Sequence, residues 1–252
     1  MGKPRIRMFA GPNGSGKSEL IRALVEKNIP LGPVINADHI AKNIHEKGFL
    51  DLEEYQLKNI TQSDWENAIH DYPEIRSRIE GSDISARILI KENTLICKIT
   101  KKESYTAALI ADFLRYSMVE QQVSFSFETV MSHPGKVEFL NYTAQKGYTT
   151  YLYYIATESP DININRVENR VAKGGHDVPV QKIKARYNRS LDLLLDALKA
   201  SDRAYLMDNS KKSNFVILEK KYNGMGYPQT KKMPRWFEKY VLNKLKNNAS
   251  DF

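Results

Sequence analysis

The sequence predicts an α/β protein in which helices cover both faces of a parallel sheet, with a small α+β insertion. Two observations support this fold class. Short apolar strand patterns alternate with amphipathic helix patterns along the chain, which is typical of parallel sheets. The chain also has 252 residues, enough for one large domain with a sizeable core.

The predicted elements follow one another in a regular order. Strand patterns cover residues 5–10, 34–37, 124–128, 150–157 and 204–208. Helix patterns cover residues 17–27, 105–121, 135–146, 162–173 and 180–200. Ligands of parallel sheets bind beyond the carboxyl ends of the strands, so the residues that follow each strand are candidates for a functional site.

Two segments lie outside this alternation. Residues 45–103 contain a surface-helix pattern and then an alternating apolar pattern that turns at residues 91–93, which indicates a β-hairpin. We therefore predict an α+β insertion at residues 45–103, inside a domain that covers residues 1–222. Residues 223–252 are predicted to be a linker and a basic amphipathic helix that packs on the domain.

The stretch "GPNGSGKS" follows the first predicted strand and fits the phosphate-loop pattern G-x-x-x-x-G-K-[ST], which predicts a P-loop NTPase or kinase fold. Its glycines let backbone N–H groups point at an anion, and the next helix adds its positive end. Lys17 is expected to reach the β- and γ-phosphates of ATP, and Ser18 to offer its hydroxyl to Mg²⁺. The alternative, a chance glycine-rich turn, is disfavoured by the flanking strand and helix. The predicted nucleotide-binding residues are Gly11, Pro12, Asn13, Gly14, Ser15, Gly16, Lys17 and Ser18.

Composition restricts the compartment and the partners. The single cysteine, Cys97, excludes a disulfide framework and a cysteine-based metal site. No apolar run is long enough to span a membrane and no signal-peptide pattern is present, so we expect a cytoplasmic protein without a membrane partner. The net charge of +8 would suit nucleic acid. Because no nucleic-acid motif is present, we prefer a basic C-terminal region beside a site for anionic substrates.

Acidic residues follow two of the predicted strands. Asp38 ends the second strand, where its carboxylate could accept the proton of an attacking hydroxyl or cap the next helix. Glu128 and Thr129 end the third strand, and a carboxylate there could hold Mg²⁺ or bind a substrate hydroxyl. The polar alternation "SFSFE" differs from four aliphatic residues followed by Asp, and this difference disfavours a mechanical ATPase.

Arginines surround a glycine pair in the last third of the chain. Arg166 and Arg170 are four residues apart and share one helix face, and Gly174–Gly175 ends that helix. This pattern predicts a hinged lid whose guanidinium groups neutralise a transferring phosphoryl group. An ordinary surface helix with solvated arginines is the alternative. The second lid helix is assigned Asp177 as its N-cap, Pro179 in its first turn, and Arg186 and Arg189 beyond it.

Five segments together resemble the zeta toxin family of P-loop kinases, in its branch with a Gly-Gly-His-Asp-Val-Pro lid. They are "GPNGSGKS", "NADHIA", "FSFETVMS", "RVENRVAKGGHDVPVQKIKARYNRSL" and "RAYLMDNS". The resemblance covers residues 5–210 apart from the insertion, and the order and spacing of the blocks are specific. Zeta toxins phosphorylate the 3′-hydroxyl of the sugar in UDP-N-acetylglucosamine with ATP, so the resemblance implies a kinase with a sugar-nucleotide acceptor. It also implies an antitoxin protein as a possible partner.

The resemblance further implies roles for individual residues. The acid in the helix before the third strand would bind the acceptor, and counting back along that helix places it at Asp112. His176 stands where the toxins carry a second lid arginine, so that charge must come from His176, Arg186 or Arg189. The resemblance also implies that Lys17 binds the phosphates of ATP and that Ser18 binds Mg²⁺. Asp38 would be the catalytic base, and Arg170 would be a lid arginine. Glu128 and Thr129 would contact the substrate or the metal.

Three other functions stay open at this point. The protein could be an ATPase or an ATP-binding switch without an acceptor, although Asp38 and the arginine-bearing lid favour a kinase. It could be a nucleic-acid end kinase, as its positive charge suggests, and its affinity would then fall steeply with salt. It could also phosphorylate another small molecule, such as a nucleoside or an antibiotic, which the sequence does not separate from a sugar nucleotide.

Overall fold

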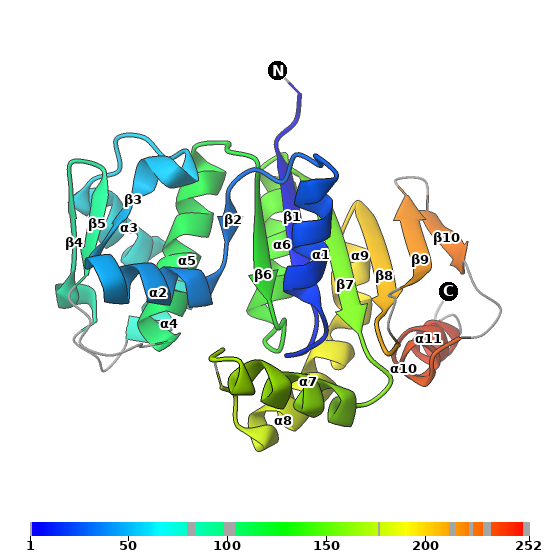
Figure 1. Ribbon diagram of the computed structural model, residues 1–252. Helices are drawn as coiled ribbons and strands as arrows, with labels where there is room; N and C mark the ends of the chain where they lie inside the picture. Colours follow the sequence, from blue (N-terminus) through cyan, green and yellow to red (C-terminus); the bar gives the residue numbers. More distant parts are fainter. Residues whose placement is uncertain are drawn as a thin grey trace. The chain divides into compact units, whose positions relative to one another are not determined.

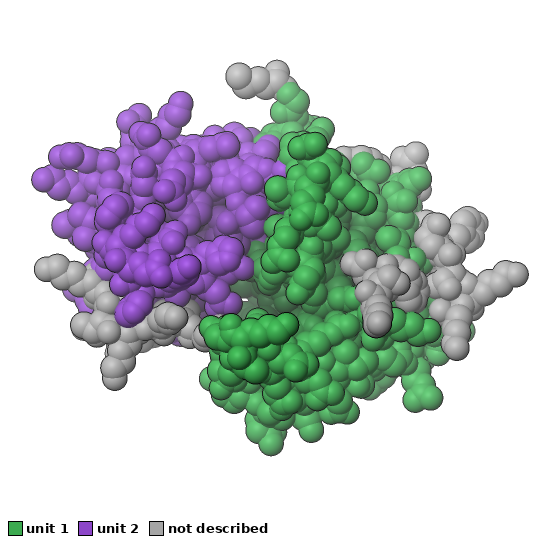
Figure 2. All heavy atoms as spheres, viewed as in Figure 1, with its two compact units in different colours: residues 1–30, 128–252 green, residues 31–127 purple. Residues whose placement is uncertain are grey.

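The structure is a computed structural model that describes residues 2–79, 84–97, 104–175, 177–211, 215–221, 224–228 and 233–248. The chain divides into two compact units (Figure 2). Unit 1 contains Met1–Pro30 and Glu128–Phe252, and unit 2 contains Leu31–Phe127.

The main sheet has seven strands in the order β10-β9-β8-β7-β1-β6-β2 (Figure 1). The pairs β1–β7, β7–β8 and β2–β6 are parallel, whereas β9 is antiparallel to both β8 and β10. The predicted α/β fold class is therefore confirmed. The strands are β1 (Arg5–Ala10), β2 (Val34–Ile35), β6 (Phe125–Thr129), β7 (Thr149–Ala156), β8 (Arg203–Asp208), β9 (Phe215–Lys221) and β10 (Gly224–Pro228).

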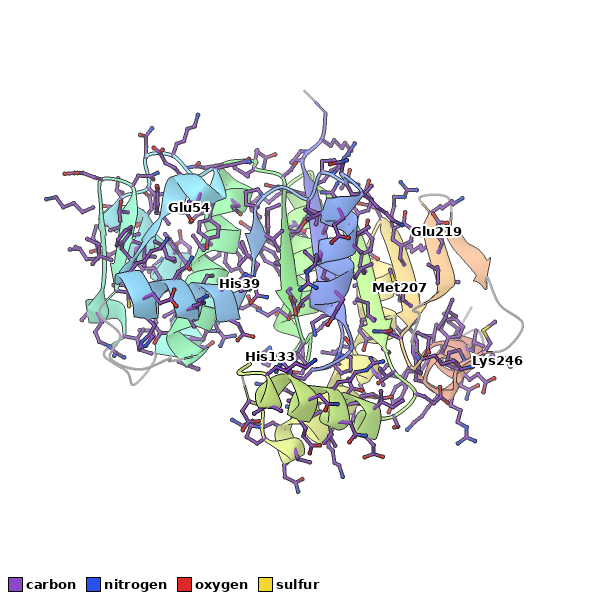
Figure 3. The ribbon with its side chains drawn as sticks, viewed as in Figure 1. His39, Glu54, His133, Met207, Glu219 and Lys246 are labelled. Atoms are coloured by element: carbon purple, nitrogen blue, oxygen red, sulfur yellow. The ribbon has the colours of Figure 1, made fainter. Side chains whose placement is uncertain are left out.

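The sequence interpretation missed the last two strands of the sheet. β10 lies in the stretch that was expected to be a linker, because two glycines and a proline in five residues are typical of turns. The strand is tolerated since it stands at the edge of the sheet, where proline is allowed. An ion pair of 3.8 Å between Arg203 and Glu219 joins β8 to β9. Glu219 is labelled on β9 in Figure 3.

Helices lie on both faces of the sheet in unit 1, with α1 on one face and α6 and α9 on the other (Figure 1). The segment predicted as one helix over residues 180–200 forms two helices, which meet at Leu193. The helices of this unit are α1 (Lys17–Glu26), α6 (Gly135–Gln145), α7 (Pro160–Ala172), α8 (Val180–Asp192), α9 (Leu194–Ala200), α10 (Arg235–Phe237), the π-helix η3 (Glu238–Leu242) and α11 (Asn243–Asn248).

Unit 2 is an α+β unit with a three-stranded sheet in the order β3-β5-β4. The predicted hairpin is present: β4 and β5 are joined by Glu92 and Asn93, whose positive φ angles of 49° and 57° suit a tight hairpin turn. The elements are α2 (Ala37–Lys47), β3 (Phe49–Asp51), η1 (Leu52–Tyr55), α3 (Gln62–Asp71), α4 (Pro73–Ile79), η2 (Ser85–Arg87), β4 (Ile88–Lys91), β5 (Thr94–Cys97) and α5 (Ser104–Glu120).

The compact unit is larger than the insertion predicted at residues 45–103. The helices α2 and α5, which flank that insertion, pack against each other and so belong to the same unit. Within the described ranges, no helix is long and apolar enough to cross a membrane.

A buried ion cluster stands in the middle of unit 2. The two carboxylate oxygens of Asp112 contact different arginines: Oδ2 accepts a hydrogen bond of 2.8 Å from Arg78 Nε, and Oδ1 forms an ion pair with Arg115 Nη2. Asp112 is 1% exposed and Arg115 is 4% exposed. Burial lowers the pKa of Arg115 to about 10, so its guanidinium is still charged at neutral pH. The carboxylate therefore balances a buried positive charge.

We expect Asp112→Ala to lower the free energy of unfolding by about 3–5 kcal/mol, because it removes the carboxylate that is paired with the buried Arg115 guanidinium. Urea denaturation followed by circular dichroism measures this difference. The control is Asp71→Ala, since Asp71 is exposed and pairs with an exposed neighbour, His70, in the same unit. Equal, small losses for the two variants would show that the cluster does not hold unit 2 together.

Candidate active site

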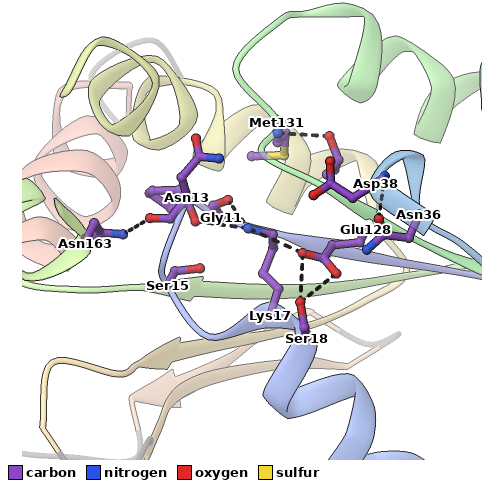
Figure 4. Close-up of polar contacts among 12 residues, drawn as sticks. Gly11, Asn13, Ser15, Lys17, Ser18, Asn36, Asp38, Glu128, Met131 and Asn163 are labelled. Atoms are coloured by element: carbon purple, nitrogen blue, oxygen red, sulfur yellow. Dashed lines mark hydrogen bonds and ion pairs between the residues drawn. The ribbon is translucent and has the colours of Figure 1, made fainter. Parts of the chain in front are cut away.

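The phosphate loop, residues 11–18, joins β1 to α1 (Figure 4). Its three glycines all have positive φ angles, 142° at Gly11, 71° at Gly14 and 102° at Gly16. A Cβ atom added to Gly11 would lie 2.1 Å from the carbonyl oxygen of Ile155, so there is also no room for a side chain. Glycine is therefore required both by the backbone conformation and by the close approach of β7.

Lys17 is the first residue of α1, and its side chain is 6% exposed. Its Nζ atom donates hydrogen bonds to the carbonyl oxygens of Gly11, at 2.9 Å, and Pro12, at 3.0 Å (Figure 4). The ammonium group is thus held at the loop by weak neutral acceptors. A phosphate is a stronger acceptor for a cation, so this position suits an anion that exchanges with the carbonyl contacts.

Ser15 tests whether the loop fits a phosphate. Its hydroxyl is buried and has no hydrogen-bond partner among the described residues. Buried polar atoms are nearly always satisfied, so a partner is to be expected at this loop. A hydroxyl can donate to a phosphate oxygen, and the glycine-lined backbone leaves N–H groups for the same purpose. The residues present therefore fit a bound phosphate.

Ser18 and Glu128 come together beside Lys17, whereas their predicted role as metal ligands stays a prediction. The Ser18 hydroxyl donates to both carboxylate oxygens of Glu128, at 3.0 and 3.3 Å. Glu128 Oε1 also lies 3.9 Å from Lys17 Nζ, and the Glu128 side chain is only 16% exposed. A hydroxyl and a carboxylate are hard oxygen ligands of the kind that Mg²⁺ prefers. This pair could therefore hold the metal.

Thr129, the last residue of β6, makes a local contact. Its Oγ1 atom accepts a hydrogen bond of 3.0 Å from the backbone N–H of Met131, which has a positive φ of 52°. The hydroxyl therefore stabilises the turn that leads towards α6. The substrate contact expected for Thr129 stays a prediction.

Asp38 lies in unit 2, in the first turn of α2, and is exposed. The N-cap of this helix is Asn36, whose Oδ1 accepts hydrogen bonds from Asp38 N at 2.8 Å and His39 N at 3.4 Å (Figure 4). The alternative role of Asp38 as the N-cap is therefore wrong. β2 already ends at Ile35, two residues earlier than expected, and this places Asn36 in the cap position. The catalytic role of Asp38 stays a prediction.

Asp112, the predicted acceptor-binding acid, is the centre of the buried ion cluster of unit 2. Both of its carboxylate oxygens already contact guanidinium groups, Oδ2 through a hydrogen bond from Arg78 and Oδ1 through an ion pair with Arg115. The structure therefore gives this residue a role in stability, and its contact with an acceptor stays a prediction.

The predicted lid corresponds to α7 and α8, residues 160–192. The two helices share an apolar cluster that is formed by Ile164, Val167, Val178 and Ile183. The helix α7 ends in a Schellman motif: Gly174 N donates to Val171 O at 2.8 Å, and Gly175 N donates to Arg170 O at 3.0 Å. The glycine pair therefore closes the helix through defined hydrogen bonds.

The start of α8 differs from the prediction. Pro179 occupies its N-cap position, and no side chain among the described residues caps the helix, so the assignment of Asp177 as the N-cap is wrong. The helix begins at Val180, three residues after Asp177, which is too far for that carboxylate to serve as the cap. His176 lies outside the described residues.

The lid arginines differ in their surroundings. Arg166 donates to two backbone oxygens, to Asn209 O at 2.7 Å and to Gly14 O at 3.5 Å, and it therefore braces the phosphate loop. Arg170, four residues later on the same helix, is exposed. On α8, Arg186 is half-buried and Arg189 is exposed. The structure thus brings Arg166 to the loop.

Three further residues at the loop were not assigned from the sequence. Asn163 Nδ2 donates to Asn13 O, and the Thr157 hydroxyl donates to Asn163 Oδ1. Asn209 Nδ2 donates to Ser15 O at 2.8 Å. Thr157 and Asn209 directly follow β7 and β8, so the rule that ligands bind beyond strand ends could have found them. Asn163 lies inside a helix, and no sequence signal distinguishes it.

Comparison with known proteins places the chain by its fold. No protein-family model matches it. It is 28% identical over 69 residues to an uncharacterised protein of Haemophilus influenzae, a match that covers 27% of this chain and 49% of the other. The chain thus spans about half the length of this curated relative.

Solved structures share the fold at low sequence identity. The chain is similar to one in the crystal structure of AvrRxo1-ORF1:AvrRxo1-ORF2 with sulphate ions, with a TM-score of 0.60, 11% identity, and coverage of 98% of this chain and 71% of that one. The structure of AvrRxo1-ORF1:-ORF2 with ATP gives a TM-score of 0.57 with the same identity and coverage. The PezAT toxin–antitoxin system of Streptococcus pneumoniae gives 0.49, with 15% identity, 85% of this chain and 72% of that one. At 11% identity, the two AvrRxo1 structures show a similar fold and nothing more. The TM-score of the PezAT structure is too low to support an argument.

Proposed function

We propose that this protein is an ATP-dependent kinase that transfers the γ-phosphate to a hydroxyl of a small molecule. The observation that carries the proposal is the adjacency of two sites, a glycine-lined loop that holds the Lys17 ammonium and the Ser18–Glu128 pair beside it. A chain of similar fold was crystallised with ATP, which supports ATP as the donor. The resemblance to zeta toxins supports a sugar nucleotide, such as UDP-N-acetylglucosamine, as the acceptor.

The phosphate loop and its neighbours would bind the donor. Bound ATP would supply the phosphoryl group, and Mg²⁺ would offset the negative charge of its phosphates. Lys17 and the loop N–H groups would orient the β- and γ-phosphates, while Ser18 and Glu128 would hold the metal. Arg166 fixes the loop through Gly14 and so acts as a positioning residue. Positioning and charge neutralisation dominate this class of reaction.

Acceptor activation is assigned to Asp38. Its exposed carboxylate is free of the capping role that Asn36 fulfils, and it would take the proton of the attacking hydroxyl. Arg170 would neutralise charge on the transferring phosphoryl group, and Asp112, Thr129 and His176 are proposed to contact the acceptor. An antitoxin is part of the same proposal, since the similar AvrRxo1 chain comes from a complex of two proteins.

Turnover assays against a panel of UDP-sugars, nucleosides and oligonucleotides test the reaction. Mass spectrometry should detect a gain of one phosphate on a small-molecule acceptor. ATP hydrolysis without an acceptor that is as fast as any transfer would instead identify an ATPase or a switch. A gain only on oligonucleotides would identify a nucleic-acid kinase.

We expect Lys17→Ala to abolish transfer and to raise the Kd for ATP by about 100-fold, because a charge-assisted contact with the phosphates is lost. Isothermal titration calorimetry measures the Kd, and circular dichroism checks that the fold is kept. The control is Lys27→Ala, which removes an exposed lysine at the other end of α1. Tight ATP binding by Lys17→Ala would contradict the assignment of the loop.

Asp38→Asn should keep the affinity for ATP and lower the transfer rate by about 10²–10⁴-fold, the range expected when a positioned base is removed. Because Asn36 is the cap, the thermal midpoint should stay unchanged. Single-turnover transfer and differential scanning fluorimetry measure the two quantities. A variant that keeps full activity would exclude Asp38 as the base.

We expect Arg170→Ala to lower kcat by about 10³-fold with a small change in the Kd for ATP, because the guanidinium acts mainly in the transition state. Arg170→Lys should recover only part of the activity, since an ammonium cannot make the bidentate contact. The control is Lys173→Ala, at the exposed end of the same helix. A kcat within about twofold of the parent for Arg170→Ala would remove the lid arginine from the mechanism.

A further inference from the structure

The C-terminal segment, residues 233–248, is anchored to unit 1 by Trp236. This side chain is 3% exposed, and its ring packs against Tyr154 of β7 with a centroid distance of 6.3 Å. The indole N–H donates a hydrogen bond of 2.7 Å to Oδ2 of Asp208, the last residue of β8. Trp236 therefore makes both an apolar contact, through its ring, and a polar contact, through its N–H group. The polar contact is with the last residue of β8, at the carboxyl end of that strand.

Asp208 organises the turn that follows β8. Its buried carboxylate also accepts hydrogen bonds from Ser210, from the backbone N–H at 3.0 Å and from the hydroxyl at 2.9 Å. The Ser210 hydroxyl in turn accepts from the backbone N–H of Glu158, at 2.8 Å. A buried carboxylate with three donors holds a short turn in one conformation, because each lost donor would leave charge unsatisfied.

The residue that this turn presents is Asn209, which touches the phosphate loop directly. Its side-chain amide donates to Ser15 O at 2.8 Å, and its own carbonyl accepts from Arg166 at 2.7 Å. A Cβ atom added to Gly16 would lie 2.3 Å from the Asn209 amide nitrogen. Asn209 therefore supports the backbone of the loop on one side and orients its arginine brace on the other.

We infer that the C-terminal segment positions the phosphate loop, and that Trp236 acts on it through Asp208 and Asn209. The indole N–H fixes the carboxylate, the carboxylate fixes the turn, and the turn holds Asn209 against Ser15. Trp236 is thus a positioning residue, which acts on the loop through Asp208 and Asn209. If Trp236 were only an apolar anchor, its N–H group would be dispensable and any large aromatic ring would serve.

Amide hydrogen exchange of the unliganded protein tests the inference in a way that needs no nucleotide. Trp236→Phe keeps an aromatic ring but removes the donor, so exchange in peptides covering residues 11–18 and 208–210 should become about three- to tenfold faster. The control is Lys244→Ala, which breaks a 2.9 Å contact of the same segment with Asp192 O and should leave both peptides unchanged. Unchanged exchange in Trp236→Phe, or an equal rise across all of unit 1, would overturn the inference.

ATP affinity then tests the route through Asn209, and this part rests on the proposed function. Trp236→Phe and Asn209→Ala should each raise the Kd for ATP by about three- to tenfold, and the double variant should be no weaker than Asn209→Ala alone. If the Kd of the double variant rises by the product of the two single increases, Trp236 does not act through Asn209. If the parent protein binds no ATP, the proposed function fails, and the exchange result alone decides the inference.

Discussion

A loop that binds an anion through its backbone N–H groups has no room for side chains at its closest contacts. This constraint determines which residues can surround the loop. Gly11 lies against the carbonyl of Ile155 in β7, and Gly16 lies against Asn209 after β8. The loop is therefore shaped by the ends of the strands around it as much as by its own glycines. A parallel sheet provides such neighbours, because the carboxyl ends of its strands meet at one edge.

Charged groups serve two different purposes in this molecule. In unit 1, Lys17 and Ser18 each contact Glu128, and Lys17 also donates to backbone carbonyls of its own loop; a bound ligand could replace these contacts. In unit 2, Asp112 and Arg115 are buried, and both carboxylate oxygens of Asp112 are paired with arginines. Exchangeable contacts suit binding, whereas a closed cluster suits stability. An acidic residue in the expected position is therefore insufficient evidence for a binding role.

The sequence was most informative where consecutive residues form both a local structure and a candidate binding site. The phosphate loop needs eight consecutive residues, and Glu128 joins it because strand ends meet at one edge, so both were predictable. Details decided by one or two residues were not: Asn36 rather than Asp38 caps α2, because β2 ends early. Contacts of residues distant in the sequence, such as Asn163 with Asn13, follow from the tertiary fold and leave no local pattern.

The first half of α7 is tied to the phosphate loop at two points, by Asn163 to Asn13 and by Arg166 to Gly14. Arg170, in its second half, is exposed. A helix fixed at its base cannot swing away as a whole, so any opening is restricted to the distal turns and the helix that follows. In the kinase proposed above, release of the nucleotide would then leave the contacts between the helix base and the loop in place.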